Sequence, residues 1–149
     1  MTVERKILWA GMLVYAVSFF LVAVGGSGLY AGAPGFACAV EAISAPLHLS
    51  DLGILAFENI SLHISGLINP VFLATVILML VRPSHRLVLI AKVALLLMAP
   101  FCWIVFHYEN LYPREGYFLW ILGMLLTLFS TNLAASNSSL HKAGVEEKT

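Results

Sequence analysis

Four long apolar blocks dominate this sequence and restrict the folds that it can adopt. They cover residues 7–25, 53–81, 87–106 and 116–135. A helix needs about 20 predominantly apolar residues to cross the roughly 30 Å hydrocarbon core of a bilayer. Because each block is long enough for one crossing, we expect an all-α membrane protein. Its fold would be a four-transmembrane-helix antiparallel bundle that forms a single domain over residues 1–135.

The composition leads to the same class of protein. Of the 149 residues, 60% are hydrophobic and only 11% are charged, whereas soluble domains have about 25% charged residues. A soluble protein with such a surface would aggregate. Eight Lys and Arg balance eight Asp and Glu, so net charge predicts neither nucleic-acid binding nor an acidic partner. The partner that the composition predicts is the lipid bilayer.

Basic residues are divided unequally between the two ends of the predicted spans. In multi-pass proteins, loops rich in Lys and Arg stay on the cytoplasmic side. One side holds only Arg114, and the other holds seven basic residues: Arg5, Lys6, Arg82, Arg86, Lys92, Lys142 and Lys148. We therefore expect both termini, the 82–86 turn and a mobile polar tail at 136–149 to be cytoplasmic. The expected location is the cytoplasmic (inner) membrane of a bacterium.

The first block has a second interpretation. Arg5 and Lys6 precede it, and Ala31-Gly32-Ala33 follows it, as in a secretory signal peptide with its cleavage site. The uncharged run over residues 7–24 is longer than the ~7 to 15 residues of a signal-peptide core. We therefore interpret the block as a retained transmembrane helix.

One long extracytoplasmic loop, rich in Gly, Pro and small residues, connects the first and second blocks. Within it Phe36, Val40, Ile43 and Leu47 recur at helical spacing, and Glu41 lies off that stripe. This spacing predicts a short interfacial helix that lies at the membrane surface or caps the bundle. The alternative is an ordered loop that packs on the helix ends.

The second block carries most of the polarity that we expect within the membrane. On a helix, Glu58, Ser65 and Asn69 share one flank, and Asn59 and His63 lie on the adjoining flank. Ionisable groups inside a membrane cost ~2.5 to 3.5 kcal/mol on insertion scales, so their presence is by default a hypothesis of function. These five residues are the candidates for ligand binding or ion coupling.

Three functional hypotheses and one structural hypothesis fit this polar face. Glu58 and His63 could take up protons or a cation from outside, because His titrates in the useful range. The face could instead form a pocket for a small ligand or lipid head group, covered by the loop that carries Cys38. A metal or haem site would need Glu58, His63 and His107, but no HxxxH or HxxE spacing supports it, so we predict no metal and no cofactor. The structural alternative is that these side chains join helices by hydrogen bonds.

The outer hairpin and the two cysteines provide secondary candidates. His107 and Glu109 lie in a polar, titratable hairpin after the third block. Cys38 and Cys102 both fall near the outer side and could form one disulfide; the alternative is that each is a small buried hydrophobe. The chain has no CxxC motif, which removes the spacing that thioredoxin-like oxidoreductases need.

Catalytic chemistry has little support in the sequence. No Ser, His and acidic set falls at one predicted depth, and no phosphate-binding loop is present, so we predict no catalytic residues. The sequence favours a non-enzymatic accessory or structural subunit of a membrane assembly, with other membrane subunits or a homo-oligomer as partners. The alternative is a small-solute, ion or proton transporter, or a ligand-binding membrane protein, that uses the polar face of the second helix.

Overall fold

The computed structural model describes residues 3–27, 31–44, 57–81 and 86–130. Within these ranges the chain is mainly helical. In chain order the elements are α1 (Val3–Ser18), β1 (Val24–Gly26), α2 (Gly35–Ser44), α3 (Phe57–Val81), α4 (Arg86–Tyr108), β2 (Leu111–Pro113) and α5 (Glu115–Phe129). The predicted tail at 136–149 lies outside the described residues, as do residues 53–56 of the second block and 131–135 of the fourth.

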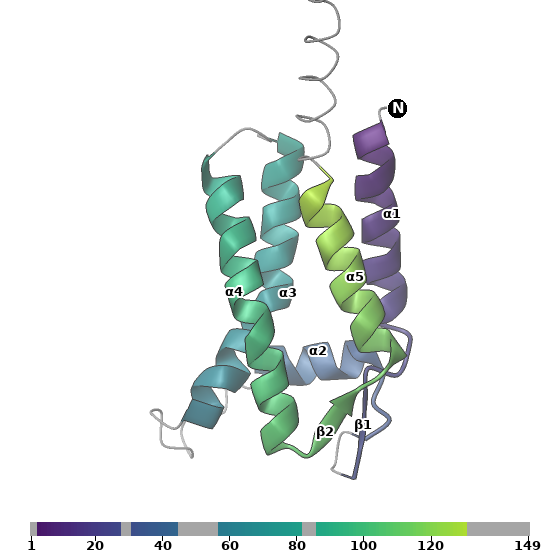
Figure 1. Cartoon of the computed structure of the whole chain (residues 1–149), viewed down its shortest axis with the longest axis vertical. Coiled ribbons are helices and arrows are strands. Elements are labelled where there is room, and N and C mark those ends of the chain that lie inside the picture. Colours follow the sequence, from purple (N-terminus) through teal and green to yellow (C-terminus); the bar gives the residue numbers. More distant parts are fainter. Residues whose placement is uncertain (1–2, 28–30, 45–56, 82–85, 131–149) are drawn as a thin grey trace, which may run out of the picture.

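Four of the helices run side by side along the long axis of the molecule, and α2 lies across them near one end (Figure 1). Helix α1 packs against α5, and α3 packs against α4; these two pairs share the largest helix contacts, and α2 packs on α3. The two strands lie near α2, at the end of the molecule opposite to the N-terminus (Figure 1). The fold is therefore two helix pairs, with α2 and a small sheet gathered at one end.

Helices approach each other closely where they carry glycine. A Cβ atom at Gly11 of α1 would lie 2.5 Å from Thr127 Oγ1 on α5, and one at Gly123 of α5 would clash with the Tyr15 backbone. A Cβ atom at Gly66 of α3 would clash with the carbonyl oxygen of a residue in α2. Small residues at such crossings let membrane helices gain van der Waals contact. These glycines therefore set the spacing of α1 with α5 and of α2 with α3.

The first helix ends earlier than the sequence predicts. Helix α1 stops at Ser18, after which the chain turns and forms β1, which pairs with β2 in antiparallel register. The prediction of one helix over residues 7–25 is therefore wrong after Ser18. Apolar residues over 19–24 do not distinguish a helix from a buried strand. Gly25 and Gly26 disfavour a helix, and Gly26 has a φ of 145° that other residues rarely adopt.

Backbone hydrogen bonds join this non-helical segment to neighbours on both sides. Four N–H donors from the segments around it bond to its carbonyl oxygens. Each of these bonds measures 2.9 Å: Gly32 to Val24, Gly35 to Leu21, Arg114 to Ala23, and Gly116 to Val22. Non-helical backbone in apolar surroundings needs such partners, because an unpaired polar group there costs several kcal/mol. The same bonds satisfy N–H groups in the first turns of α2 and α5.

The apolar core lies between the two helix pairs. Its main cluster draws buried residues from α1, α3, α4 and α5: Tyr15, Ile68, Phe72, Val76, Leu95, Met124 and Leu128. A smaller cluster of Leu8, Met79 and Val88 continues it towards the end that carries the N-terminus.

Apolar side chains also cover the outside of the helices. Among the described residues, α3 over Ile60–Val81 and α4 over Arg86–Tyr108 are long and apolar enough to cross a membrane. Their outward side chains are not buried: Ile77 is 61% exposed and Leu97 is 67% exposed. The core helix of a soluble protein would bury most of such residues. The second and third blocks thus form two candidate membrane spans.

Candidate functional site

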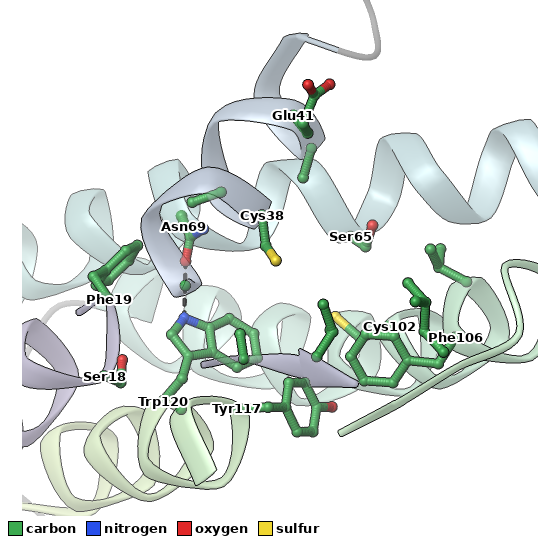
Figure 2. Close-up of a pocket in the computed structure, with 18 of the residues that line it drawn as sticks. Ser18, Phe19, Cys38, Glu41, Ser65, Asn69, Cys102, Phe106, Tyr117 and Trp120 are labelled. Atoms are coloured by element: carbon green, nitrogen blue, oxygen red, sulfur yellow. Dashed lines mark hydrogen bonds between the residues drawn. The ribbon is translucent and has the colours of Figure 1, made fainter. Parts of the chain in front are cut away.

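A cavity of about 330 Å³ lies between the two helix pairs, next to α2 and the small sheet. Its wall contains residues of α2, of both strands and of the adjoining parts of the four long helices (Figure 2). Most of the wall is apolar, with side chains such as Phe19, Leu62 and Phe106. Ligand pockets typically measure about 300 to 1,000 Å³ and combine an apolar wall with a few polar groups. This cavity falls at the lower end of that range.

Asn69 forms the polar centre of the wall. Its Oδ1 atom accepts a hydrogen bond from the Tyr15 hydroxyl of α1 at 2.8 Å and another from the Trp120 indole Nε1–H of α5 at 2.9 Å. Because an indole N–H can only donate, the atom that faces Trp120 must be the amide oxygen. Asn69 therefore links α3 to the α1–α5 pair (Figure 2). Its amide nitrogen makes no hydrogen bond within the described part of the chain and is available to a bound molecule.

The serine hydroxyls of the wall bond within their own helices. Ser18 donates to the Tyr15 carbonyl oxygen at 2.6 Å, and Ser65 donates to the Leu62 carbonyl oxygen at 2.8 Å. Ser44 donates to the Glu41 carbonyl oxygen at 2.9 Å. The hydroxyl protons are therefore used, and the oxygens face the cavity as hydrogen-bond acceptors.

Two acidic residues complete the wall on its solvent side. Glu41 of α2 and Glu109, just after α4, line the cavity and are exposed. Among the described residues that form the wall, none is Lys, Arg or His. Among the described residues of the wall, the charged groups are therefore these two exposed carboxylates.

The two cysteines face the same cavity, one from α2 and the other from α4 (Figure 2). Both are free thiols in the structure. Burial raises the pKa of the Cys38 thiol, because a thiolate is costly in apolar surroundings. Cys38 is therefore protonated at neutral pH, and the Cys38–Cys102 disulfide stays a prediction.

Aromatic side chains of α4 and α5 pack around Tyr117 at one side of the cavity. The Tyr117 ring lies edge-on to Phe106, with centroids 4.9 Å apart, and lies 5.6 Å from the ring of Trp120. Its hydroxyl is buried and makes no hydrogen bond within the described part of the chain, and the Trp103 ring lies edge-on to the Tyr117 ring, with centroids 6.1 Å apart. This group gives the cavity a rigid aromatic side.

The structure brings some of the predicted site residues together and separates others. Ser65, Asn69 and Glu109 line the cavity, together with Cys38 and Cys102. His63 of α3 is half-buried and lies outside the wall, and exposed His107 packs beside Tyr108. The side chains of Glu58 and Asn59 lie outside the described residues.

Sequence reasoning missed Tyr15, Trp120 and Glu41 as parts of the site. A signal was present for Trp120, because a tryptophan inside a span needs an acceptor for its N–H. Nothing in the sequence points to Tyr15, whose partner lies on a helix far along the chain. Neither a protein-family model, nor a curated protein, nor a solved structure matches this chain. No relative or structural neighbour therefore indicates what the cavity binds.

Proposed function

We propose that this chain is an integral membrane protein with four spans, formed by α1, α3, α4 and α5. The support is the apolar outer surface of these helices. Besides α3 and α4, both shorter helices present large exposed apolar residues: Trp9, Leu13 and Val17 on α1, and Phe118, Leu122 and Phe129 on α5. In water such a surface would drive aggregation, whereas in a bilayer it meets lipid chains.

We also propose that the end with α2 and the sheet faces away from the cytoplasm. Arg5, Lys6 and Arg86 begin α1 and α4 at the opposite end (Figure 1). At the cavity end the described basic residue is Arg114, which pairs with Glu115 at 3.2 Å. By the positive-inside rule this asymmetry supports a cytoplasmic N-terminus. The cavity then opens on the outer side of a bacterial cytoplasmic membrane.

The function that we propose is the non-catalytic binding of a small, mainly apolar molecule in the cavity. The observation that carries this proposal is the cavity itself, because its volume of about 330 Å³ and its mainly apolar wall with a few polar groups are typical of ligand pockets. A purely structural subunit has no need of such a space. Transport across the membrane has less support. A polar path that continues from the cavity along α3 would have to pass Asn69, whose side chain is hydrogen-bonded to Tyr15 and Trp120. The accessory-subunit role stays a prediction of the sequence.

Trp120 offers a direct test, because this tryptophan lines the cavity. The chain has three tryptophans, and the W9F/W103F variant keeps only Trp120. In nanodiscs of zwitterionic lipid we expect 8-bromooctanol, whose bromine quenches indole fluorescence on contact, to quench Trp120 saturably. The matched control W103F/W120F keeps only Trp9, which is 55% exposed. That control should show linear quenching from partition into lipid.

The proposed binding is contradicted if Trp120 and Trp9 give the same linear quenching. A cavity-filling variant, Ala39→Phe, should abolish the saturable component while the fluorescence spectrum and melting temperature stay near those of the parent. Where that variant does not fold, Cys102→Phe fills the cavity from α4 instead.

A further inference from the structure

We infer that the ligand of this cavity is a lipophilic cation, an amine or quaternary ammonium compound with an apolar tail. Its head group lies at the acidic margin, and its tail lies along the aromatic side towards Trp120. In Figure 2 Cys38 lies between Glu41 and Trp120, and the Glu41 carboxylate points away from the other labelled side chains, towards the outside of the cavity. This inference rests on the proposed ligand-binding function.

The charges of the wall favour a positive head group. Glu41 and Glu109 each contribute a carboxylate, and no basic residue opposes them among the described residues of the wall. The neighbouring Arg114 is not part of the wall, and its guanidinium binds the carboxylate of Glu115 through Nε and Nη2, both at 3.2 Å. A fatty acid or phosphate head group would meet repulsion at this margin, whereas an ammonium group would be attracted.

The helix ends around the cavity lead to the same preference. Helix N-termini bind anions when their N–H groups are free. Here Gly35 and Gly116, in the first turns of α2 and α5, already donate to the Leu21 and Val22 carbonyl oxygens at 2.9 Å. The C-terminal end of α2 lines the cavity through Ser44, and this end of a helix carries partial negative charge.

The remaining polar and aromatic groups suit an ammonium compound. The oxygens of the wall serines can accept hydrogen bonds, because each hydroxyl proton is used within its own helix. Phe106, Tyr117 and Trp120 provide ring faces and edges for an apolar tail, and such faces also attract cations that have lost their water. An amide nitrogen of Asn69 adds a single donor, which is too little for an anionic head group.

The test compares three molecules with the same tail in the W9F/W103F protein: 8-bromooctylammonium, 8-bromooctanol and 8-bromooctanoate. In zwitterionic nanodiscs we expect the ammonium compound to bind Trp120 about tenfold more tightly than the alcohol, and the carboxylate to bind more weakly than both. In an added E41Q/E109Q double variant, the Kd of the ammonium compound should rise to that of the alcohol. The Kd of the alcohol should not change.

The control variant is Glu115→Gln, which removes an exposed carboxylate at the same end of the molecule but outside the wall. It should leave all three affinities within about twofold, because exposed charges act weakly through solvent. Saturable binding of the alcohol with no preference for the ammonium compound overturns the charge inference and leaves the proposed binding function intact. Absence of saturable quenching by all three molecules overturns both.

Discussion

At the scale of single residues, Asn69 links the two helix pairs by hydrogen bonds. It lies on α3 and accepts hydrogen bonds from Tyr15 and Trp120, which lie on the other pair. Interhelical hydrogen bonds in membranes contribute about 0.5 to 2 kcal/mol. Replacement of the acceptor is more costly than this, because it leaves two donors without a partner in an apolar environment.

We predict that Asn69→Ala lowers the free energy of unfolding by about 1 to 3 kcal/mol. In a double-mutant cycle with Tyr15→Phe, the coupling energy should be about 0.5 to 1.5 kcal/mol, measured by reversible unfolding in mixed micelles. Ser65→Ala is the matched control, since Ser65 lines the same cavity but bonds to its own helix; it should change stability by less than about 0.5 kcal/mol. Zero coupling between Asn69 and Tyr15 would rule out the proposed junction.

Sequence reasoning identified Asn69 and Ser65 as polar residues on one face but could not assign their partners. That choice depends on Tyr15 and Trp120, which come from elements far away in the sequence. The structural alternative is that polar side chains join the helices by hydrogen bonds. The Asn69 oxygen does this. A role of Asn69 in contact with a ligand stays a prediction, because a hydrogen bond accepted by the oxygen does not occupy the nitrogen.

The thiol of Cys38 provides a second prediction at this scale. Burial raises its pKa, so less thiolate is present at pH 8 than for an unperturbed cysteine, and thiolate is the reactive form. In the C102A variant, the rate of iodoacetamide alkylation should keep rising tenfold per pH unit beyond pH 8.5. Glutathione under the same conditions is the control and should reach its plateau earlier. A plateau at or below the pH of the glutathione plateau would show that Cys38 is not buried.

At the scale of secondary structure elements, the α1–α5 pair depends on close backbone contact. Gly11 and Gly123 leave room for the partner helix, with Thr127 and Tyr15 directly opposite. A side chain at either glycine has no flexible neighbour to displace, because the atoms it meets are mainly backbone. The pair can therefore adjust only by moving one helix away from the other.

We predict that Gly123→Leu lowers the free energy of unfolding by at least about 2 kcal/mol, since overpacking costs about 1 to 3 kcal/mol or more. Leu122→Phe is the matched control on the same helix, because Leu122 is 46% exposed and a larger apolar side chain there can extend away from the protein. Thermal unfolding in one detergent compares the two variants. Equal melting temperatures for Gly123→Leu and the parent would contradict the close approach.

The elements themselves could be predicted to different degrees. Helices α3 and α4 could be read from the sequence because each is a continuous apolar run that ends at charges or Pro. The end of α1 could not be predicted, because it depends on pairing between residues 22–26 and the hairpin after α4. Such non-local pairing leaves no pattern within the first block, where a buried strand and a helix look alike.

At the scale of the whole molecule, the cavity results from how the two helix pairs and α2 pack together. No single segment encodes it, and its wall combines residues from nearly every element. One hypothesis from the sequence is a ligand pocket on the second helix, covered by the loop that carries Cys38. Helix α2, which carries Cys38, packs on α3, and ligand binding there stays a prediction. Sequence reasoning could not show that Glu41 and Glu109 line the same cavity, because they come from segments far apart in the sequence.

Single-cysteine labelling tests whether the four long helices cross the membrane. In a C38A/C102A background, Asn110→Cys, Thr2→Cys and Ser84→Cys are exposed in turn to a membrane-impermeant maleimide in intact bacterial cells. We expect the cysteine at residue 110 to be labelled in intact cells, and those at residues 2 and 84 to be labelled only after permeabilisation. Labelling of all three from the same side, or release of the protein from membranes by alkaline carbonate, would contradict the four-span arrangement.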